Sequence, residues 1–144
     1  MAASFRYLDD VALADLAFEA EGDSIEEVFT AATNAVIDVM ANPLTVGTTW
    51  ERQVERKEQD AAALLFDWLS DLVYWKDADG VVFSKASLTV FQEQDVWTLN
   101  ATLSGEAVNQ ATQELRNDVK GVTKHLYRLV QADGRWKVTV VLDV

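Results

Sequence analysis

Apolar positions near the start of the chain follow a strand pattern and then a helical one. Residues 5–8 and 13–20 are mostly apolar and β-forming, and they predict two short strands. Over residues 25–40, apolar side chains recur every three or four positions, which predicts a helix of about four turns with one apolar stripe. Ser24 and Glu27 match a capping box, in which hydroxyl and carboxylate bond free amides at a helix start.

The next apolar pattern predicts a strand and a second helix. Pro43 cannot continue a helix, so the first helix ends before it, and residues 46–57 predict a polar strand. A helical pattern begins near Gln59 or Asp60, and its apolar residues leave little of the circumference polar. We expect this second helix to be buried on two sides, between layers of the fold.

The rest of the chain predicts two hairpins. Residues 81–91 and 96–103 are rich in β-forming residues, and the second run alternates apolar and polar side chains at period two. Residues 119–131 and 136–144 predict a final hairpin around an Asp-Gly turn. Between the hairpins, residues 105–118 lack periodicity and form the longest expected loop, a length that is often functional or mobile.

This order of elements is typical of an α+β fold. Two strands, a helix, a strand, a helix and four strands predict two helices packed on one face of a mainly antiparallel sheet. At 144 residues the chain suits one domain, residues 1–144, which is large enough to bury a core without disulfides or a metal. The order of the strands in the sheet does not follow from the pattern.

The charge of the chain limits its partners. It carries 24 acidic and 12 basic residues, a formal charge of −12, and a field of that sign repels nucleic-acid phosphates and anionic membranes. A cation or a basic protein surface is a better partner. The sequence has no cysteine, no signal-peptide pattern and no long apolar span, so we expect a soluble cytoplasmic protein without disulfides or thiolate zinc sites.

Positive charge is concentrated in the strand expected at residues 119–131. If side chains alternate strictly along this strand, its basic residues share one face with apolar neighbours: Lys120, Val122, Lys124, Leu126, Arg128 and Val130. The opposite face then carries Thr123, His125 and Tyr127. Two interpretations remain open. The lysines belong to a solvated sheet face where they discourage edge pairing, or they form a functional surface.

Carboxylates gather at the end of the last expected strand. Asp143 precedes Val144, whose carboxylate would add to an acidic pair that needs a cation or donor to offset its charge. Asp15, which opens the second strand, is the most economical partner, with Asp9 and Asp10 just upstream. Ca²⁺ and Mg²⁺ prefer such oxygen ligands. The alternative is chance, because an acidic chain has many aspartates near strand ends.

No common catalytic motif occurs in the sequence. The chain lacks the P-loop, dinucleotide-binding, nucleophile-elbow and HExxH patterns. His125 is the only histidine, which excludes a multi-histidine zinc centre, and beside Thr123 it offers a proton-transfer pair without a marked nucleophile. The sequence therefore gives no signature of an enzyme.

Six segments, spread over nearly the whole chain, follow one another in the order known from one family. They are Y-L-D-D-V-A-L-A-D at 7–15, G-D-S-I-E-E-V-F at 22–29, L-L-F-D-W-L-S-D-L-V-Y at 64–74, D-G-V-V-F-S at 79–84, V-K-G-V-T-K-H at 119–125 and the final V-L-D-V. On these segments the chain resembles archease. The resemblance implies an α+β fold in which one strand-helix-strand-strand unit is inserted in another.

The resemblance also implies a function. Archease proteins activate tRNA-splicing RNA ligases, which join phosphate or cyclic-phosphate ends of RNA to hydroxyl ends, by promoting guanylylation of the ligase and its multiple turnover. On this basis the chain is an accessory factor and not an enzyme, its partner is the ligase, and RNA is reached only through the ligase. We expect a monomer without membrane contact.

The resemblance assigns roles to particular residues. It implies that Asp15 and Asp143 bind a divalent cation, which is calcium in the family, with magnesium or manganese as alternatives, and that the carboxylate of Val144 joins them. The segment V-K-G-V-T-K-H implies that Lys120 and His125 contact the partner or a phosphate.

Two segments depart from the family pattern. The histidine of the family's H-T-A-D motif is missing at residues 10–12, and residues 113–116 are Q-E-L-R where the family often has H-x-P-K. Arg116 keeps a positive charge there and is a third candidate for contact with the partner or phosphate. The departures concern the ligase contact and could alter the choice of partner.

Two other classes of function remain open. A generic protein-interaction or chaperone-like module would keep its partner binding after loss of the carboxylates. A stand-alone metal-dependent enzyme would turn over a phosphorylated substrate without any ligase.

Overall fold

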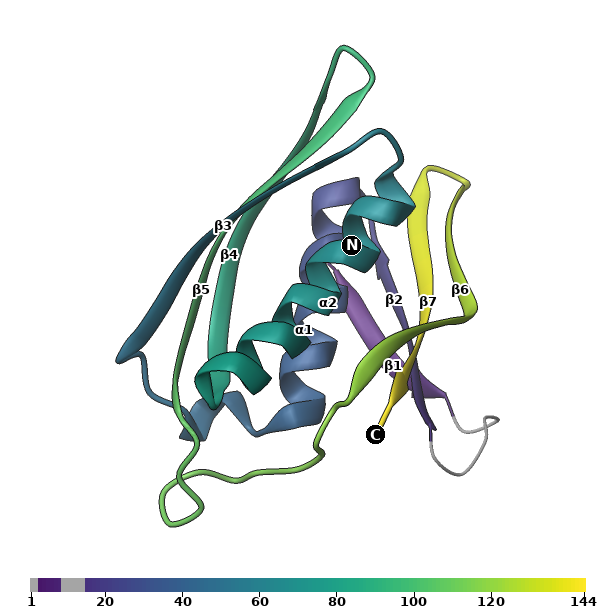
Figure 1. Cartoon of the computed structure of the whole chain (residues 1–144). Coiled ribbons are helices and arrows are strands. Elements are labelled where there is room, and N and C mark those ends of the chain that lie inside the picture. Colours follow the sequence, from purple (N-terminus) through teal and green to yellow (C-terminus); the bar gives the residue numbers. More distant parts are fainter. Residues whose placement is uncertain (1–2, 9–14) are drawn as a thin grey trace.

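The computed structural model describes residues 3–8 and 15–144 (Figure 1). Its elements follow in the order β1 (Ser4–Leu8), β2 (Asp15–Gly22), α1 (Ile25–Met40), the short 3₁₀ helix η1 (Pro43–Thr45), β3 (Trp50–Glu58), α2 (Ala61–Asp79), β4 (Val81–Glu93), β5 (Val96–Ala107), β6 (Gly121–Ala132) and β7 (Arg135–Asp143). Apart from η1, this is the order of strands and helices expected from the sequence.

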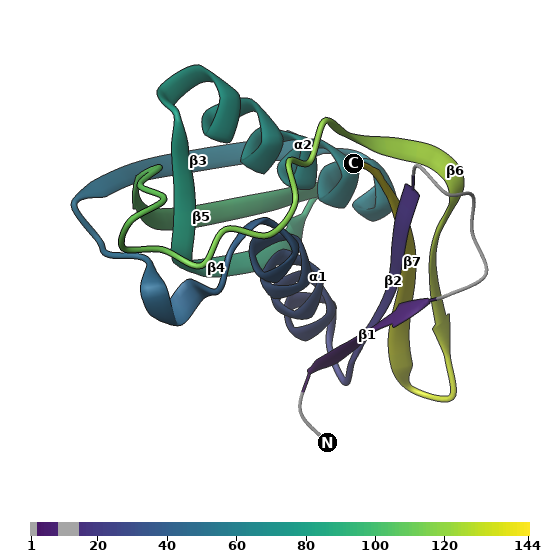
Figure 2. The ribbon, with the colours of Figure 1, turned by 90° about the horizontal axis from the view of Figure 1, so that it is seen from below.

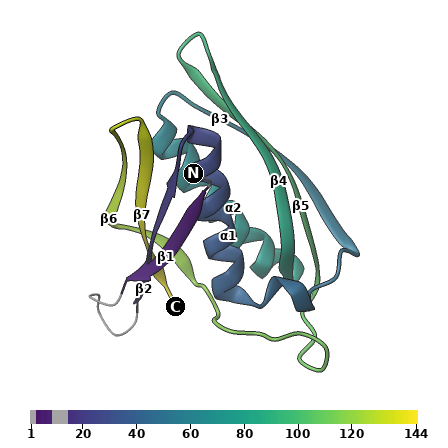
Figure 3. The same cartoon turned by 180° about the vertical axis from the view of Figure 1, so that it is seen from behind.

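The strands form two antiparallel sheets with both helices between them. One sheet has the order β1-β2-β7-β6, and the other has the order β3-β5-β4. The view from below shows α1 and α2 between the two sheets (Figure 2), and the view from behind shows the same layers (Figure 3). Each sheet turns one face to the helices, and most of the buried apolar side chains form one core cluster.

Local sequence signals explain where α1 begins. Ser24 is the N-cap, and its Oγ accepts a hydrogen bond from the Glu27 amide at 3.1 Å. The Glu27 carboxylate accepts from the Asp23 amide at 2.8 Å, one residue before the amide that a capping box uses. The expected cap is therefore confirmed, with a shift of one residue in its second bond.

The apolar circumference of α2 matches its place between the sheets. Asp60 caps its start, accepting from the Ala63 amide at 3.2 Å, and Gly80 follows its end with a φ of 62°, a left-handed conformation that suits glycine. In the core, Trp68 Nε1 donates to Thr33 Oγ1 of α1 at 2.8 Å, which joins the two helices. Within the described residues, no helix has the length and apolar character needed to span a membrane.

The expected α+β class is confirmed, whereas the single expected sheet is two sheets. Alternation of apolar and polar residues identifies strands but not their partners, so this division is not visible in the sequence. β3 begins at Trp50 and not at residue 46, because residues 46–49 form an irregular bend between η1 and β3, and β5 continues past residue 103 to Ala107. The expected start of the second strand at residue 13 lies outside the described residues.

Strict alternation along β6, expected from the sequence, is wrong. Thr123 pairs with Val141 and Arg128 pairs with Thr139, so residues 124–127 lie opposite Val140 alone. We call residues 124–127 the β6 bulge. Extra residues on one strand bend it and redirect its side chains. The side chains of β6 therefore do not divide into the two alternating faces that the sequence predicted.

Candidate functional site

Asp15 and Asp143 stand opposite each other in the four-stranded sheet. Asp15 is the first residue of β2, Asp143 is the last residue of β7, and the antiparallel register pairs them directly. Residues paired in this way have Cβ atoms about 5 Å apart. Both residues are half-buried. The fold thus brings together the two aspartates predicted as metal ligands.

Two further predicted residues adjoin this pair. Lys120 is exposed, and its amide donates to the Asp143 carbonyl at 2.7 Å. Val144 follows Asp143 and packs, half-buried, against the core cluster. Figure 1 shows the end of β7 beside the starts of β2 and β6. We call Asp15, Lys120, Asp143 and Val144 the edge site.

A buried lysine that the sequence analysis missed holds the segment before Lys120. Lys76, in the last turn of α2, is 8% exposed. Its Nζ donates to Asp118 Oδ1 at 2.6 Å and to the Val119 carbonyl at 2.5 Å, and it lies 2.9 Å from Asp77 Oδ1. A cation also suits this end of a helix, where free carbonyls carry partial negative charge. Lys76 therefore ties α2 to the residues that lead into the edge site.

These contacts change the pKa of both partners. Burial by itself lowers the pKa of Lys76, but the hydrogen bonds to Asp118 and Asp77 outweigh burial and raise the pKa above its ordinary value. The hydrogen bond from Lys76 lowers the pKa of Asp118. Both groups are therefore charged at neutral pH. In the sequence, Lys76 is distinguished only by its place near the end of the second helix. Exposed lysines are also common at helix ends, so this place did not indicate that Lys76 is buried.

The loop before β6 is hydrogen-bonded to the end of α1. The amides of Arg116 and Asn117 donate to the carbonyls of Met40 and Val39, at 2.9 Å and 3.1 Å. A helix end leaves such carbonyls without partners inside the helix, so the loop supplies what α1 lacks. The long loop expected from the sequence is present, and it caps a helix.

The Arg116 guanidinium is engaged by neighbouring carboxylates. It donates to Glu114 Oε2 at 2.9 Å and to Asp38 Oδ1 at 2.8 Å, and these bonds, the one to Glu114 first, raise its pKa. Tyr7 Oη donates to the other oxygen of Asp38 at 2.5 Å, and burial together with this bond raises the pKa of Tyr7. Arg116 thus links the loop to α1, and its contact with a partner stays a prediction.

His125 lies further along β6 than the edge site. Gly121, at the start of β6, pairs with Asp143, whereas His125 is exposed within the β6 bulge, opposite Val140. The register therefore places Lys120 beside the aspartate pair and His125 several residues away from it. Contact of His125 with a partner or phosphate stays a prediction.

The oxygen donors of the edge site suit a hard divalent cation. Ca²⁺ binds carboxylate oxygens and water in flexible geometry, so the opposed carboxylates of Asp15 and Asp143 suit it. In the described part of the chain, no group of three or more Asp, Glu, His or Cys side chains is placed to hold a metal. Among the described residues, Asp15 and Asp143 are the side-chain carboxylates that make up the edge site. Asp9 and Asp10 lie outside the described residues.

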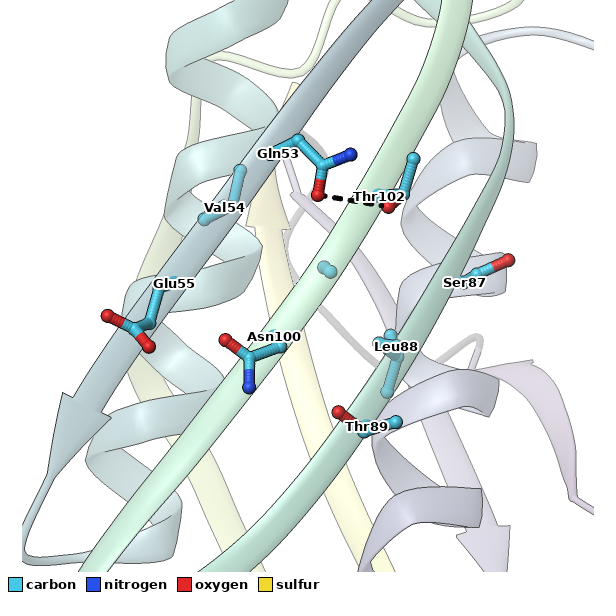
Figure 4. A pocket seen from close by; sticks show the side chains of 9 residues that line it. Gln53, Val54, Glu55, Ser87, Leu88, Thr89, Asn100 and Thr102 are labelled. Atoms are coloured by element: carbon cyan, nitrogen blue, oxygen red, sulfur yellow. Dashed lines mark hydrogen bonds between the residues drawn. The ribbon is translucent and has the colours of Figure 1, made fainter.

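A depression of about 470 Å³ lies on the other sheet. Figure 4 shows its polar side chains, with Thr102 Oγ1 donating to Gln53 Oε1 at 3.4 Å. The lining residues come from β3, β4 and β5: Gln53, Val54, Glu55, Ser87, Leu88, Thr89, Asn100, Ala101 and Thr102. This depression therefore shares no element with the edge site.

Known sequences resemble the chain over nearly its whole length. Residues 5–144 match the Archease protein family (MTH1598/TM1083). A protein archease from Methanothermobacter thermautotrophicus is 36% identical over 131 residues, which are 91% of this chain and 93% of that protein. A protein archease from Methanosarcina mazei is 33% identical over 141 residues, which are 97% of this chain and 95% of that protein.

Solved structures share the fold. The solution structure of Methanobacterium thermoautotrophicum protein 1598 has 35% identity and a TM-score of 0.83, covering 97% of this chain and 98% of that one. The crystal structure of an archease from Thermotoga maritima, described as a possible chaperone, has 19% identity and a TM-score of 0.63, covering 92% and 93%. The second likeness concerns the fold alone. With the family match and the relatives above 30% identity, it follows that this chain belongs to the archease family.

Proposed function

We propose that this chain is an accessory factor that activates a tRNA-splicing RNA ligase through a divalent cation bound at Asp15, Asp143 and Val144. The observation that carries the proposal is the register that sets Asp15 opposite Asp143, next to Lys120. Membership of the archease family supports it, because resemblance to that family implies both the ligase and the cation. The activation consists of faster guanylylation of the ligase and its repeated turnover.

The residues of the edge site have separate roles in this proposal. Asp15 and Asp143 hold the cation, which when bound offsets phosphate charge and orients attack at the nucleotide site of the ligase. Lys120, exposed beside them, offers an ammonium group to a phosphate or to an acidic group of the ligase. Lys76 holds the segment before Lys120 through its bond to Asp118.

The charge of the chain favours a protein partner over direct binding to RNA. With a formal charge of −12, the molecule repels a phosphate backbone unless a cation or another protein intervenes. The proposal accordingly assigns RNA contact to the ligase and gives this chain a local site at one edge of a sheet.

The test is single-turnover guanylylation of a cognate tRNA-splicing ligase at fixed calcium concentration. We expect wild-type protein to accelerate the reaction, and Asp15→Asn and Asp143→Asn to lose about tenfold or more of that acceleration. Replacing a residue that only orients a metal ligand already reduces metal affinity or activity about tenfold or more, and replacing the ligand itself should reduce it at least as much. Asp143→Ala should behave like Asp143→Asn.

Glu55→Gln is the matched control. Glu55 is an exposed carboxylate on β3, in the other sheet, so its substitution makes the same change in net charge without touching the edge site. It should accelerate guanylylation as wild type does. Full acceleration by both aspartate variants would overturn the proposal.

A second candidate is a chaperone-like interaction module. The description of the Thermotoga maritima structure as a possible chaperone favours it. This function predicts that partner binding survives in Asp15→Asn and Asp143→Asn and that no variant changes the rate of guanylylation. A stand-alone enzyme would instead turn over a phosphorylated substrate with no ligase present.

A further inference from the structure

The β6 bulge is held in place by contacts with α2. Tyr127 Oη donates to the Ala62 carbonyl at 2.6 Å, and the Tyr127 ring meets the Phe66 ring edge-on with centroids 5.3 Å apart. Lys124 Nζ lies 3.8 Å from the centre of the same Phe66 ring, a cation–π contact. Residues on both sides of Leu126 and His125 are thus fixed to the helix. The bulge is a built feature of the fold.

Leu126 is unfavourable for the isolated chain in two respects. Its φ is 58°, a left-handed conformation that costs a non-glycine residue free energy, and the residue is 57% exposed, so its apolar side chain gains little from burial. Glycine or asparagine would meet the backbone requirement at lower cost. If the β6 bulge served only to keep this edge strand from pairing with another strand, position 126 would not need a large apolar side chain. A contact outside the chain would explain why leucine stands here.

The strand that carries Leu126 is basic. β6 carries Lys124 and Arg128 and no acidic residue, although the whole chain has 24 acidic and 12 basic residues. Leu126 and His125 are exposed between these two cations. Asp60 and Asp67 of α2 lie on the helix side of the bulge, where, after burial, their charges raise the pKa of Tyr127. On β6 itself, the two cations beside Leu126 complement carboxylates at the border of an apolar pocket.

The β6 bulge and the edge site lie on the same pair of strands. Gly121 of β6 pairs with Asp143, and the bulge lies opposite Val140, three residues back along β7. At about 3.3 Å per residue the separation is about 10 Å. A protein surface that covers the edge site is large enough to reach the bulge, because a typical interface buries about 800 Å² on each partner.

We propose that the β6 bulge is a docking point at which Leu126, flanked by Lys124 and Arg128, enters an apolar pocket bordered by carboxylates on the protein partner that receives the edge site. This inference rests on the proposed function for the identity of that partner, the ligase. It adds a source of affinity separate from the cation. In this proposal Leu126 contributes affinity for the ligase, and the edge site promotes its guanylylation.

The test is affinity for the ligase, measured by calorimetry with Leu126→Gly and Leu126→Ala. Both substitutions remove the anchor, and we expect each to weaken binding about tenfold or more, as for a buried anchor at an interface. Glycine also relieves the left-handed strain, so Leu126→Gly should raise the midpoint temperature of unfolding. Weaker binding by a more stable protein separates docking from a structural role.

Leu44→Ala is the matched control. Leu44, in η1, is 93% exposed, so the same leucine-to-alanine change removes apolar surface away from the four-stranded sheet. It should bind the ligase as wild type does. Unchanged affinity of a folded Leu126→Gly protein would overturn the docking point.

The same experiment separates this inference from the proposed function. If wild-type protein accelerates guanylylation and the Leu126 variants bind as wild type does, the docking point is wrong and the proposed function stands. If the Leu126 variants bind weakly but wild type does not accelerate guanylylation, the docking point stands and ligase activation is wrong. If wild type does not bind the ligase at all, both are wrong.

Discussion

Two threonine hydroxyls in this fold have opposite surroundings. Thr33 Oγ1 donates to the Phe29 carbonyl at 2.7 Å and accepts from Trp68 Nε1 at 2.8 Å, so it satisfies an indole that is buried between the sheets. Thr123 Oγ1, just before the β6 bulge, is shielded from solvent and has no hydrogen-bond partner among the described residues. A polar group desolvated without a partner reduces stability, whereas a paired one does not.

Thr123→Val should therefore leave the free energy of unfolding unchanged or raise it by up to about 1 kcal/mol, because valine has nearly the same shape and no hydroxyl to desolvate. Thr33→Val, the same chemical change, should lower the free energy of unfolding by about 1–3 kcal/mol, since the Trp68 indole loses its acceptor. Urea unfolding followed by tryptophan fluorescence measures both. Equal losses in the two variants would show that the Thr123 hydroxyl has a partner.

The loop between β5 and β6 shows how an irregular element can fix a site. Its backbone bonds the free carbonyls at the end of α1, and Asp118 within it pairs with Lys76 of α2. Lys120, which follows, bonds Asp143 of β7. The loop therefore connects the edge site to both helices, and its contacts with α1 and α2 hold Lys120 in place.

The pairing of Lys76 with Asp118 predicts a defined pH dependence. The pKa of Asp118 is lowered from its ordinary value of 3.8, so its contribution to stability is present above pH 3.8 and is lost as the pH falls through the lower, folded-state pKa. The pKa of Lys76 is raised from 10.5, so its contribution is complete below pH 10.5 and is lost as the pH rises through the higher, folded-state pKa.

Asp118→Asn should thus be less stable than wild type by a constant amount between about pH 5 and pH 9, and the difference should shrink below pH 3.8. Because the Asp118 side chain is 77% exposed, solvent screening keeps the difference to about 1 kcal/mol or less. Thermal unfolding of both proteins across this pH range measures it. A difference that persists unchanged at pH 2 would contradict the role of the Asp118 charge.

At the level of elements, local signals in the sequence predicted more than long-range ones. Ser24 and Glu27 fixed the start of α1, and the apolar circumference of α2 indicated its burial, because these features depend on neighbours within a few residues. The β6 bulge and the contacts of Lys76 involve residues far apart in the sequence, and no periodicity encodes them. The edge site was anticipated from carboxylate chemistry and the resemblance to archease.

At the scale of the whole molecule, the sheet order brings the two ends of the sequence together. β7 lies between β2 and β6, so the last residue of β7 is paired with the first residue of β2. In the unfolded chain, Asp15 and Asp143 are far apart along the sequence and bind a cation only as separate carboxylates. A cation held by both would therefore bind the folded state and stabilise it.

Calcium at about 100 times its dissociation constant should raise the free energy of unfolding by about 2.7 kcal/mol. For a chain of this size, that is a rise of about 5–10 °C in the midpoint temperature, reversed by a chelator. Asp15→Asn and Asp143→Asn should abolish the rise. Glu55→Gln should keep it, which distinguishes the edge site from diffuse binding to a surface with a formal charge of −12. Since this measurement needs no ligase, an equal rise in all three variants would assign the cation elsewhere, even if the chain activates a ligase.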